Sequence, residues 1–156
     1  MHDPRPGPVD DIDARLLRAL VANPRGTALA LAEAAGLSRN TVQARLARFE
    51  ERGVLRSEER RIDPAALGYP LTAYVTVVVV QRLLDPVAEA LAAIPEVLEV
   101  VGVSGQGDLQ VQVVARDADD LYRIAGRLLA IDGVERTTTS LVMRRLVDHR
   151  VTQLLP

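Results

Sequence analysis

Residues 27–53 read TALALAEAAGLSRNTVQARLARFEERG, and this stretch predicts two helices joined by a tight turn. Thr27 and Ser38 are each placed to cap a helix, because their side-chain oxygens can accept hydrogen bonds from free backbone N–H groups. Gly36 lies between them, where a left-handed backbone conformation would end the first helix. The second helix has one apolar face, made by residues at positions i, i+4 and i+7: Val42, Leu46 and Phe49.

The remaining surface of the second helix is polar without being acidic. It carries Arg39, Asn40, Gln43, Arg45 and Arg48. In a helix-turn-helix, residues near the N-terminus of the second helix reach the bases, where arginine reads guanine and asparagine or glutamine reads adenine. We therefore expect base contacts from Arg39, Asn40, Thr41 and Gln43. An ordinary surface helix would also show a solvated polar face, and it is the preceding short helix and tight turn that favour DNA binding.

Composition excludes several classes of site. The 156 residues suffice for two small domains, and 48% of them are hydrophobic. There is no cysteine, and the only histidines are His2 and His149, so we expect no disulfide, no thiol nucleophile, no metal site and no cofactor. No apolar run reaches the length of about 18 residues that spans a bilayer. We expect a cytoplasmic protein with no membrane partner.

Basic charge is concentrated around the second helix. The whole chain has a formal net charge of -2, but residues 38–61 contain seven arginines against four acidic residues. A local excess of arginine is typical of a surface that binds the phosphates of nucleic acid. The distribution therefore supports the DNA-binding interpretation, although the net charge alone would not.

The regions beside this stretch complete a predicted winged-helix head. Residues 1–9, with three prolines and a glycine, predict a loose arm. A first helix is expected from Asp10 or Asp11, with a buried apolar stripe, and Asn23-Pro24 ends it. Residues 54–63, VLRSEERRID, predict a wing or two-stranded ribbon whose arginines could contact phosphates. The arginines in question are Arg56, Arg60 and Arg61.

The rest of the chain alternates strands and helices in the order βαββαβ. Strands are predicted at residues 71–83, 97–104, 109–115 and 134–147, with helices that begin at Asp85-Pro86 and at Asp117. The first strand is so rich in β-branched residues that we expect it to be buried on both faces or at an interface. This order predicts an α+β protein with a ferredoxin-like second domain, both of whose helices cover one sheet face. A second chain would cover the other face and form a dimer.

Taken together, the chain resembles the Lrp/AsnC family of feast/famine transcription regulators. The resemblance runs from Asp11 to about Arg150. It is carried by five motifs in the right order, namely DIDARLLRAL, GLSRNTVQARLARFEERGVL, IDPAALGY, VSGQGDLQVQV and VERTTTSLVM. It implies an N-terminal arm and winged helix-turn-helix domain in residues 1–61, a linker in residues 62–70, and in residues 71–156 a "regulation of amino-acid metabolism" domain that binds ligand and oligomerises.

The resemblance also implies the partners and the site residues. Such proteins bind double-stranded DNA and form dimers that assemble into octamers or other even-numbered particles. Small effectors, often amino acids, bind between the dimers. DNA contacts are implied for Ser38, Arg39, Asn40, Thr41, Gln43, Arg45 and Arg48. Effector contacts are implied for Ser104, Gly105, Gly107, Asp108, Thr138, Thr139 and Ser140.

The chemistry of an amino acid suits these effector positions. Asp108 could accept hydrogen bonds from the ammonium group, while backbone N–H groups, Thr139 and Ser140 could donate to the carboxylate. Alternatively, the Gly-x-Gly-Asp sequence is simply a hairpin turn that Asp108 caps. Many members carry an aromatic residue beside this aspartate, where the present chain has Gly107 and Leu109, so a wall that stacks on an aromatic effector is not expected.

Two other functions remain open at this stage. The protein could bridge or wrap DNA as an architectural particle without any effector. It could also resemble the haem-biosynthesis decarboxylases that share both domains, in which case catalytic groups would be sought among His149, Tyr69, Tyr74 and Tyr122. We predict a regulator rather than an enzyme, with no catalytic residues.

Overall fold

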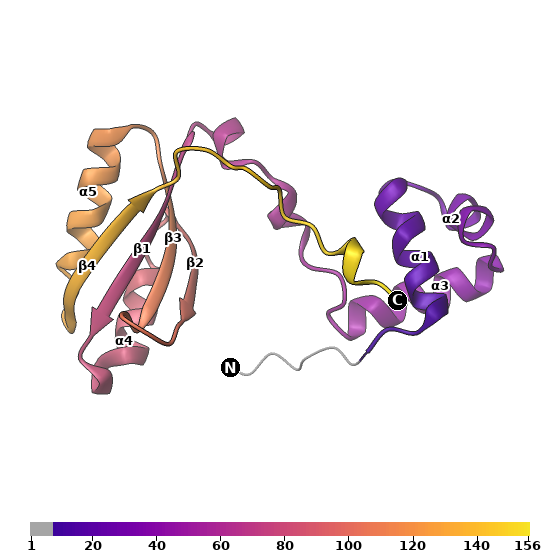
Figure 1. The fold of residues 1–156 in the computed structure, drawn as a ribbon, viewed down its shortest axis with the longest axis horizontal. Coiled ribbons are helices and arrows are strands. Elements are labelled where there is room, and N and C mark those ends of the chain that lie inside the picture. The colour runs from indigo at the N-terminus through magenta and orange to yellow at the C-terminus, as the bar shows by residue number, and fades with distance from the viewer. Residues whose placement is uncertain (1–7) are drawn as a thin grey trace. The chain divides into compact units, whose positions relative to one another are not determined.

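The computed structural model describes residues 8–156, so most of the predicted N-terminal arm, residues 1–9, lies outside the described part of the chain. The chain divides into two compact units. The first contains the described residues up to Arg60 together with Val147–Pro156, and the second is Arg61–Leu146 (Figure 1). Within residues 8–156, no helix is both long and apolar enough to cross a bilayer.

The first unit is a bundle of three helices, α1 (Asp11–Ala22), α2 (Ala28–Ala35) and α3 (Arg39–Glu51). The predicted caps are confirmed: Thr27 accepts from Ala30 N–H, Ser38 accepts from Thr41 N–H, and Gly36 ends α2 with a φ of 64°. The side chains of this core come from all three helices, and the largest of those fully buried are Leu16, Leu31, Val42 and Phe49. The helix-turn-helix prediction is therefore confirmed.

The predicted ribbon after α3 is wrong. Residues 54–63 contain no strand; the segment forms the 3₁₀ helix η1 (Glu58–Arg61), and a second, η2 (Pro64–Leu67), follows it. The physical reason lies in the sequence between Leu55 and Ile62, where six polar and charged residues in a row offer no apolar face for strand pairing to bury.

The C-terminal tail packs with the first unit rather than with the second, where we had predicted it. It includes the short 3₁₀ helix η4 (Thr152–Leu154). Arg18 of α1 donates hydrogen bonds from Nη2 to the carbonyl oxygens of Leu155 and Pro156, the first at 3.4 Å. These contacts, between residues 137 and 138 positions apart in sequence, link the tail to α1 within the first unit.

The second unit is a four-stranded antiparallel sheet with two helices, as predicted. Its elements are β1 (Leu71–Val79), η3 (Gln81–Leu83), α4 (Leu84–Ala92), β2 (Val97–Gly102), β3 (Leu109–Ala115), α5 (Ala118–Leu129) and β4 (Val134–Leu141). The strand order β2-β3-β1-β4 is that of a ferredoxin-like fold. Three strands are shorter than predicted, and only β3 has the predicted bounds. Strand β4 ends at Leu141, which is paired with Ala73 of β1.

The core lies on one face of this sheet. Alternate residues of β1 and β3 are buried there against α4 and α5. Among them, Val75 and Val111 face Val87 and Ile124 in a single apolar cluster. The opposite face carries no helix, and Tyr74 at its centre is 41% exposed. Within one chain, β1 is therefore buried on one face only, and the prediction of burial on both faces would require a second chain.

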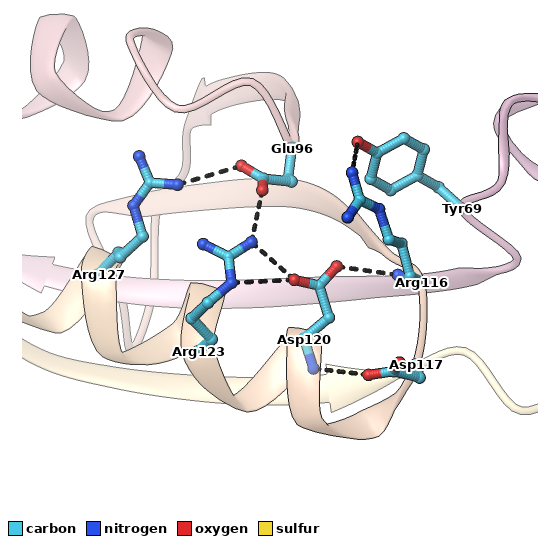
Figure 2. Close-up of polar contacts among 7 residues, drawn as sticks. All are labelled: Tyr69, Glu96, Arg116, Asp117, Asp120, Arg123 and Arg127. Carbon is cyan, nitrogen blue, oxygen red and sulfur yellow. Dashed lines mark hydrogen bonds and ion pairs between the residues drawn. The ribbon is translucent and has the colours of Figure 1, made fainter.

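An ion-pair network fixes α5 to the loop before β2 (Figure 2). Glu96, which is almost completely buried, accepts from Arg123 at 2.6 Å and from Arg127 at 3.3 Å. Arg123 also pairs with Asp120 at 2.6 Å. Beside it, Arg116 donates to the Tyr69 hydroxyl at 3.2 Å and lies 5.3 Å from the centre of that ring. The arginines of α5 are thus largely occupied within the unit.

Replacing Glu96 by glutamine is expected to lower the melting temperature by a few degrees at neutral pH. The hydrogen bond from Arg123 is the main cause that lowers the pKa of Glu96 below its ordinary 4.5. A carboxyl group of this kind stabilises the fold above its unfolded-state pKa, and the contribution is lost as the pH falls through the lowered folded-state pKa. Melting curves of both proteins should therefore converge below pH 4.5. Glu89→Gln, at an exposed position on α4, is the control, and an equal effect of this change would contradict the prediction.

Candidate DNA-binding helix and effector pocket

The N-terminal half of α3 presents an exposed polar surface. Arg39, Asn40 and Gln43 are exposed, and within residues 8–156 their side chains make no hydrogen bond or ion pair. Ser38 and Thr41 differ, because their hydroxyl oxygens lie 2.8 Å apart and Ser38 also caps the helix. Arg48 is exposed one turn further along. The arrangement leaves long, unpaired donors and acceptors at the helix end that enters a groove in helix-turn-helix proteins.

Arg45 differs from these exposed residues because it is paired within the first unit, and its contact with DNA stays a prediction. Its Nη1 donates to Asp10 Oδ2 at 2.5 Å and to Asp13 Oδ1 at 2.8 Å, and its side chain is only 20% exposed. Asp13 is 1% exposed. Asp10 caps α1. The pKa of its carboxyl group is lowered, mainly by the hydrogen bond from the backbone N–H of Asp13 and next by the hydrogen bond from the Arg45 side chain. Arg45 therefore connects α3 to the start of α1.

Sequence reasoning also overlooked Ala44 and Ala47, which are exposed on α3 beside the polar side chains. Small residues allow the helix backbone to approach a ligand closely, and an alanine methyl group can contact the methyl group of thymine. Ala44 and Ala47 have no polar group that would indicate a contact with DNA, but their spacing places them on the helix face opposite Val42 and Phe49.

The turn between β2 and β3 is held by Asp108, as in the simpler of the two interpretations. Asp108 Oδ2 accepts a hydrogen bond from Val79 N–H at 2.9 Å, and the backbone N–H of Asp108 donates to the Val77 carbonyl at 2.9 Å. Gly105 adopts a φ of 120°, a conformation that favours glycine. One oxygen of the Asp108 carboxylate is thus used within the chain, and the role of Asp108 as the acceptor for an ammonium group stays a prediction.

A pocket of about 420 Å³ lies beside this turn on the open sheet face. The residues that line it come from three strands and the turn, and they are Thr76, Val78, Val103, Ser104, Gln106, Gly107, Gln110, Arg136 and Thr138. A volume of this order is within the range of small-molecule sites. The fold therefore brings Ser104, Gly107 and Thr138 together, as predicted.

Other predicted effector residues do not reach the pocket. Gly105 and Asp108 do not line it. On β4, Thr138 lies opposite Thr76, whereas Thr139 lies opposite the buried Val75 and so belongs to the helix-covered face. Ser140 shares the open face with Thr138 but is paired with Tyr74, outside the pocket. Three further residues line the pocket and were not predicted: Gln106, Gln110 and Arg136. Gln110 and Arg136 lie on β3 and β4, and only the register of these strands with β1 brings them close to the turn.

Gly107 is required by a close approach to β1. A Cβ atom at this position would lie 2.3 Å from Thr76 Cγ2. We expect Gly107→Ala to lower the free energy of unfolding by about 1–3 kcal/mol, the usual cost of overpacking. Gly102→Ala, where a Cβ would have no neighbour within 4 Å, serves as the control. Adding Thr76→Ser, which removes the Cγ2 methyl group, should restore part of the loss in urea unfolding; no recovery would argue against the contact.

Comparisons with known proteins identify both the helix-turn-helix domain and the domain that contains the pocket. Residues 9–50 match the model of the AsnC-type helix-turn-helix domain, and residues 72–152 match that of the Lrp/AsnC ligand binding domain. The chain is 30% identical over 149 residues to the HTH-type transcriptional regulator FL11 of Pyrococcus horikoshii, which covers 96% of this chain and 97% of that protein. It is 36% identical over 148 residues to the regulator AldR of Mycolicibacterium smegmatis, covering 92% and 86% of the two chains.

A solved structure gives the same result in three dimensions. The feast or famine regulatory protein of M. tuberculosis, solved in complex with L-methionine, superposes with a TM-score of 0.81 at 32% identity. The match covers 92% of this chain and 98% of that chain.

Proposed function

Because the chain belongs to the Lrp/AsnC family of transcriptional regulators, we propose that it binds specific double-stranded DNA sites through α3 and that a small effector tunes this binding. The observation that carries the DNA-binding half is the exposed, unpaired group Arg39, Asn40 and Gln43 at the start of α3. In the major groove, an arginine can form two hydrogen bonds with guanine, and an asparagine or glutamine can form two with adenine.

The other predicted contacts on α3 divide into two roles. Ser38, Thr41 and Arg48 suit phosphates, because hydroxyl groups and arginine at the edge of a recognition helix hold the DNA backbone. Arg45 acts indirectly by fixing α3 to α1 through Asp10 and Asp13. Phosphate contacts release counterions, so the affinity should fall steeply with salt concentration.

We propose a dimer as the binding unit. The open sheet face, which carries the exposed side chains of Tyr74, Val101 and Val103, is the surface that a second copy would cover, and a two-fold dimer would recognise a roughly palindromic site. Further assembly into octamers is the expectation for this family. The protein would act in the cytoplasm, where bacterial and archaeal DNA lies.

The pocket on the open sheet face is the proposed effector site. It supplies hydroxyl and amide groups and one arginine in a volume of about 420 Å³. The L-methionine complex of the M. tuberculosis relative supports a metabolite of amino-acid size. An effector that binds one assembly state more tightly would shift the population toward that state and so change the DNA affinity.

The experiment that tests this function is DNA binding to the region upstream of the protein's own gene, measured at several salt concentrations with and without small-metabolite pools. Specific binding that a pool changes is the expected result. Specific binding that no pool changes would favour the architectural alternative. No specific binding would contradict the proposal.

A tetrapyrrole-acting enzyme finds little support, since neither histidine nor tyrosine lines the pocket.

A further inference from the structure

We propose that Arg15 of α1 is a further DNA-binding residue, which holds a backbone phosphate at the edge of the groove that α3 enters. The proposal rests on the proposed DNA-binding function of α3 and adds a contact from a second helix. It depends on where the first unit places the Arg15 guanidinium and on the partners that this group lacks among residues 8–156.

The Arg15 side chain lies beside the turn between α2 and α3. Gly36 ends α2 in this turn with a φ of 64°, and a Cβ atom added to Gly36 would lie 3.8 Å from Arg15 Nη1. Ser38, the cap of α3, follows two residues later, so its Cα atom lies at most about 7.6 Å from that of Gly36. The fold therefore brings a guanidinium from α1 close to the end of α3 that enters a groove in helix-turn-helix proteins.

The core of the first unit fixes this arrangement. Leu16, the neighbour of Arg15 in sequence, is fully buried in one cluster with Leu31 of α2. The packing of α1 against α2 thus brings together Arg15 and Gly36, which are far apart along the chain. A guanidinium on a packed helix has less freedom to lose on binding than one on a loose segment.

The guanidinium of Arg15 is available to a ligand. The residue is exposed, and among residues 8–156 its side chain has no hydrogen bond or ion pair. Asp11, one turn earlier on the same helix, is also exposed and does not pair with it. Two other arginines of the first unit differ, because Arg18 donates to the C-terminal tail and Arg45 is held by two aspartates.

A phosphate is the group that this position fits. The major groove is about 12 Å wide, and a helix with its side chains is about 10–12 Å in diameter, so α3 alone would fill the groove. A side chain that comes from α1 would therefore meet the sugar-phosphate backbone at the groove's edge rather than a base. Arginine is permanently charged and can form two hydrogen bonds with one phosphate. We thus expect Arg15 to add affinity without reading the sequence.

The test compares the salt dependence of DNA binding by the full native chain and by Arg15→Gln. Each phosphate that a protein neutralises contributes about 0.9 to the slope of log K against log salt concentration, so the slope should become shallower by about 0.9 for each bound chain. Affinity should fall by about 3- to 10-fold for each half-site. The factor should be the same on operator and on scrambled duplex, because a phosphate contact is independent of sequence.

Two variants control for other causes. Arg15→Lys keeps the charge and should keep most of the slope. Arg82→Gln removes one positive charge from an exposed position in the second unit, and it should leave the slope unchanged. Urea unfolding of Arg15→Gln should match that of the native protein, because the side chain is exposed and has no partner to lose within residues 8–156.

A scan with neutral phosphates locates the contact. Single phosphates of each operator half-site are replaced by methylphosphonates, each of which removes one negative charge. One replacement that weakens binding of the native protein should have no further effect on Arg15→Gln, because the two changes remove the same interaction. Arg82→Gln should stay sensitive to that replacement.

The outcomes separate the role of Arg15 from the proposed function. An unchanged slope in Arg15→Gln, an equal change in Arg82→Gln, or full sensitivity of Arg15→Gln to every methylphosphonate would overturn the role of Arg15, while specific operator binding would still uphold the regulator. Weaker binding to the operator alone would mean that Arg15 reads a base, and would also overturn it. A shallower slope on the scrambled duplex without any specific operator would uphold the contact and contradict the regulator. Absence of binding to any duplex would overturn both.

Discussion

Changing both Arg39 and Gln43 to alanine is expected to abolish specific operator binding at physiological salt. Each side chain is exposed at the start of α3 and has no hydrogen-bond or ion-pair partner among residues 8–156. A bidentate contact between such a residue and a base is worth about 1–3 kcal/mol, so the two losses together, about 2–6 kcal/mol, correspond to roughly 30-fold to 10⁴-fold in affinity. The measurement is a titration of labelled operator against a scrambled duplex of equal length, since base contacts should be lost selectively and non-specific binding should largely remain.

The matched control is the double change of Gln81 and Arg82 to alanine. These two residues are of the same types, are exposed, and lie in η3, which belongs to the second unit whereas α3 belongs to the first. This variant loses the same charge, so it corrects for the general electrostatic attraction to DNA. If both double variants weakened operator binding equally, α3 would not be the element that reads the sequence.

The largest effect on stability is expected for Asp13→Ala. Asp13 is 1% exposed, accepts from Arg45 at 2.8 Å, and receives a second hydrogen bond from the backbone N–H of Asp10. Removing one partner of a buried ion pair costs about 3–5 kcal/mol of stability. Because Arg45 is partly exposed and keeps Asp10 as a second partner, we expect a smaller loss of about 2–3 kcal/mol. Urea unfolding measures the loss, and operator affinity should fall with it because α3 loses its attachment to α1.

Asp11→Ala provides the comparison for this prediction. Asp11 is also acidic and in the first turn of α1, but it is exposed, so both variants lose the same favourable interaction with the helix dipole. Adding Arg45→Met to Asp13→Ala should cost less than the sum of the single changes, because the pair is then removed as a whole. A fully additive result would mean that the two side chains do not act together.

Local chemistry explains why much of the fold was predictable. Thr27, Gly36 and Ser38 each act through residues within five positions, and every one of them caps a helix as their types indicate. The alternation of Leu109, Val111 and Val113 likewise fixed the bounds and the buried face of β3. Where a structure is decided by neighbours in sequence, residue type and spacing carry enough information to predict it.

Prediction was limited where distant segments decide the outcome. Arg45 was predicted to face DNA, since spacing on α3 says nothing of Asp10 and Asp13, which lie 35 and 32 residues away. Arg136 was overlooked because only the pairing of β4 with β1 brings it beside the turn after β2. Asp108 and Thr139 stay predictions from the family resemblance, which supplies positions in the sequence but not the face of the sheet to which each side chain points; in this chain neither residue lines the pocket.

The position of the C-terminal tail has a consequence for the order of synthesis. Residues 147–156 are translated after the whole of the second unit, yet they pack with the helices, where Arg18 contacts Leu155 and Pro156. The helices leave the ribosome first and must hold together through their own core while the sheet is still being made. A nascent chain that is arrested before residue 147 would therefore lack the hydrogen bonds from Arg18 to Leu155 and Pro156, and the helices would depend on their own core alone.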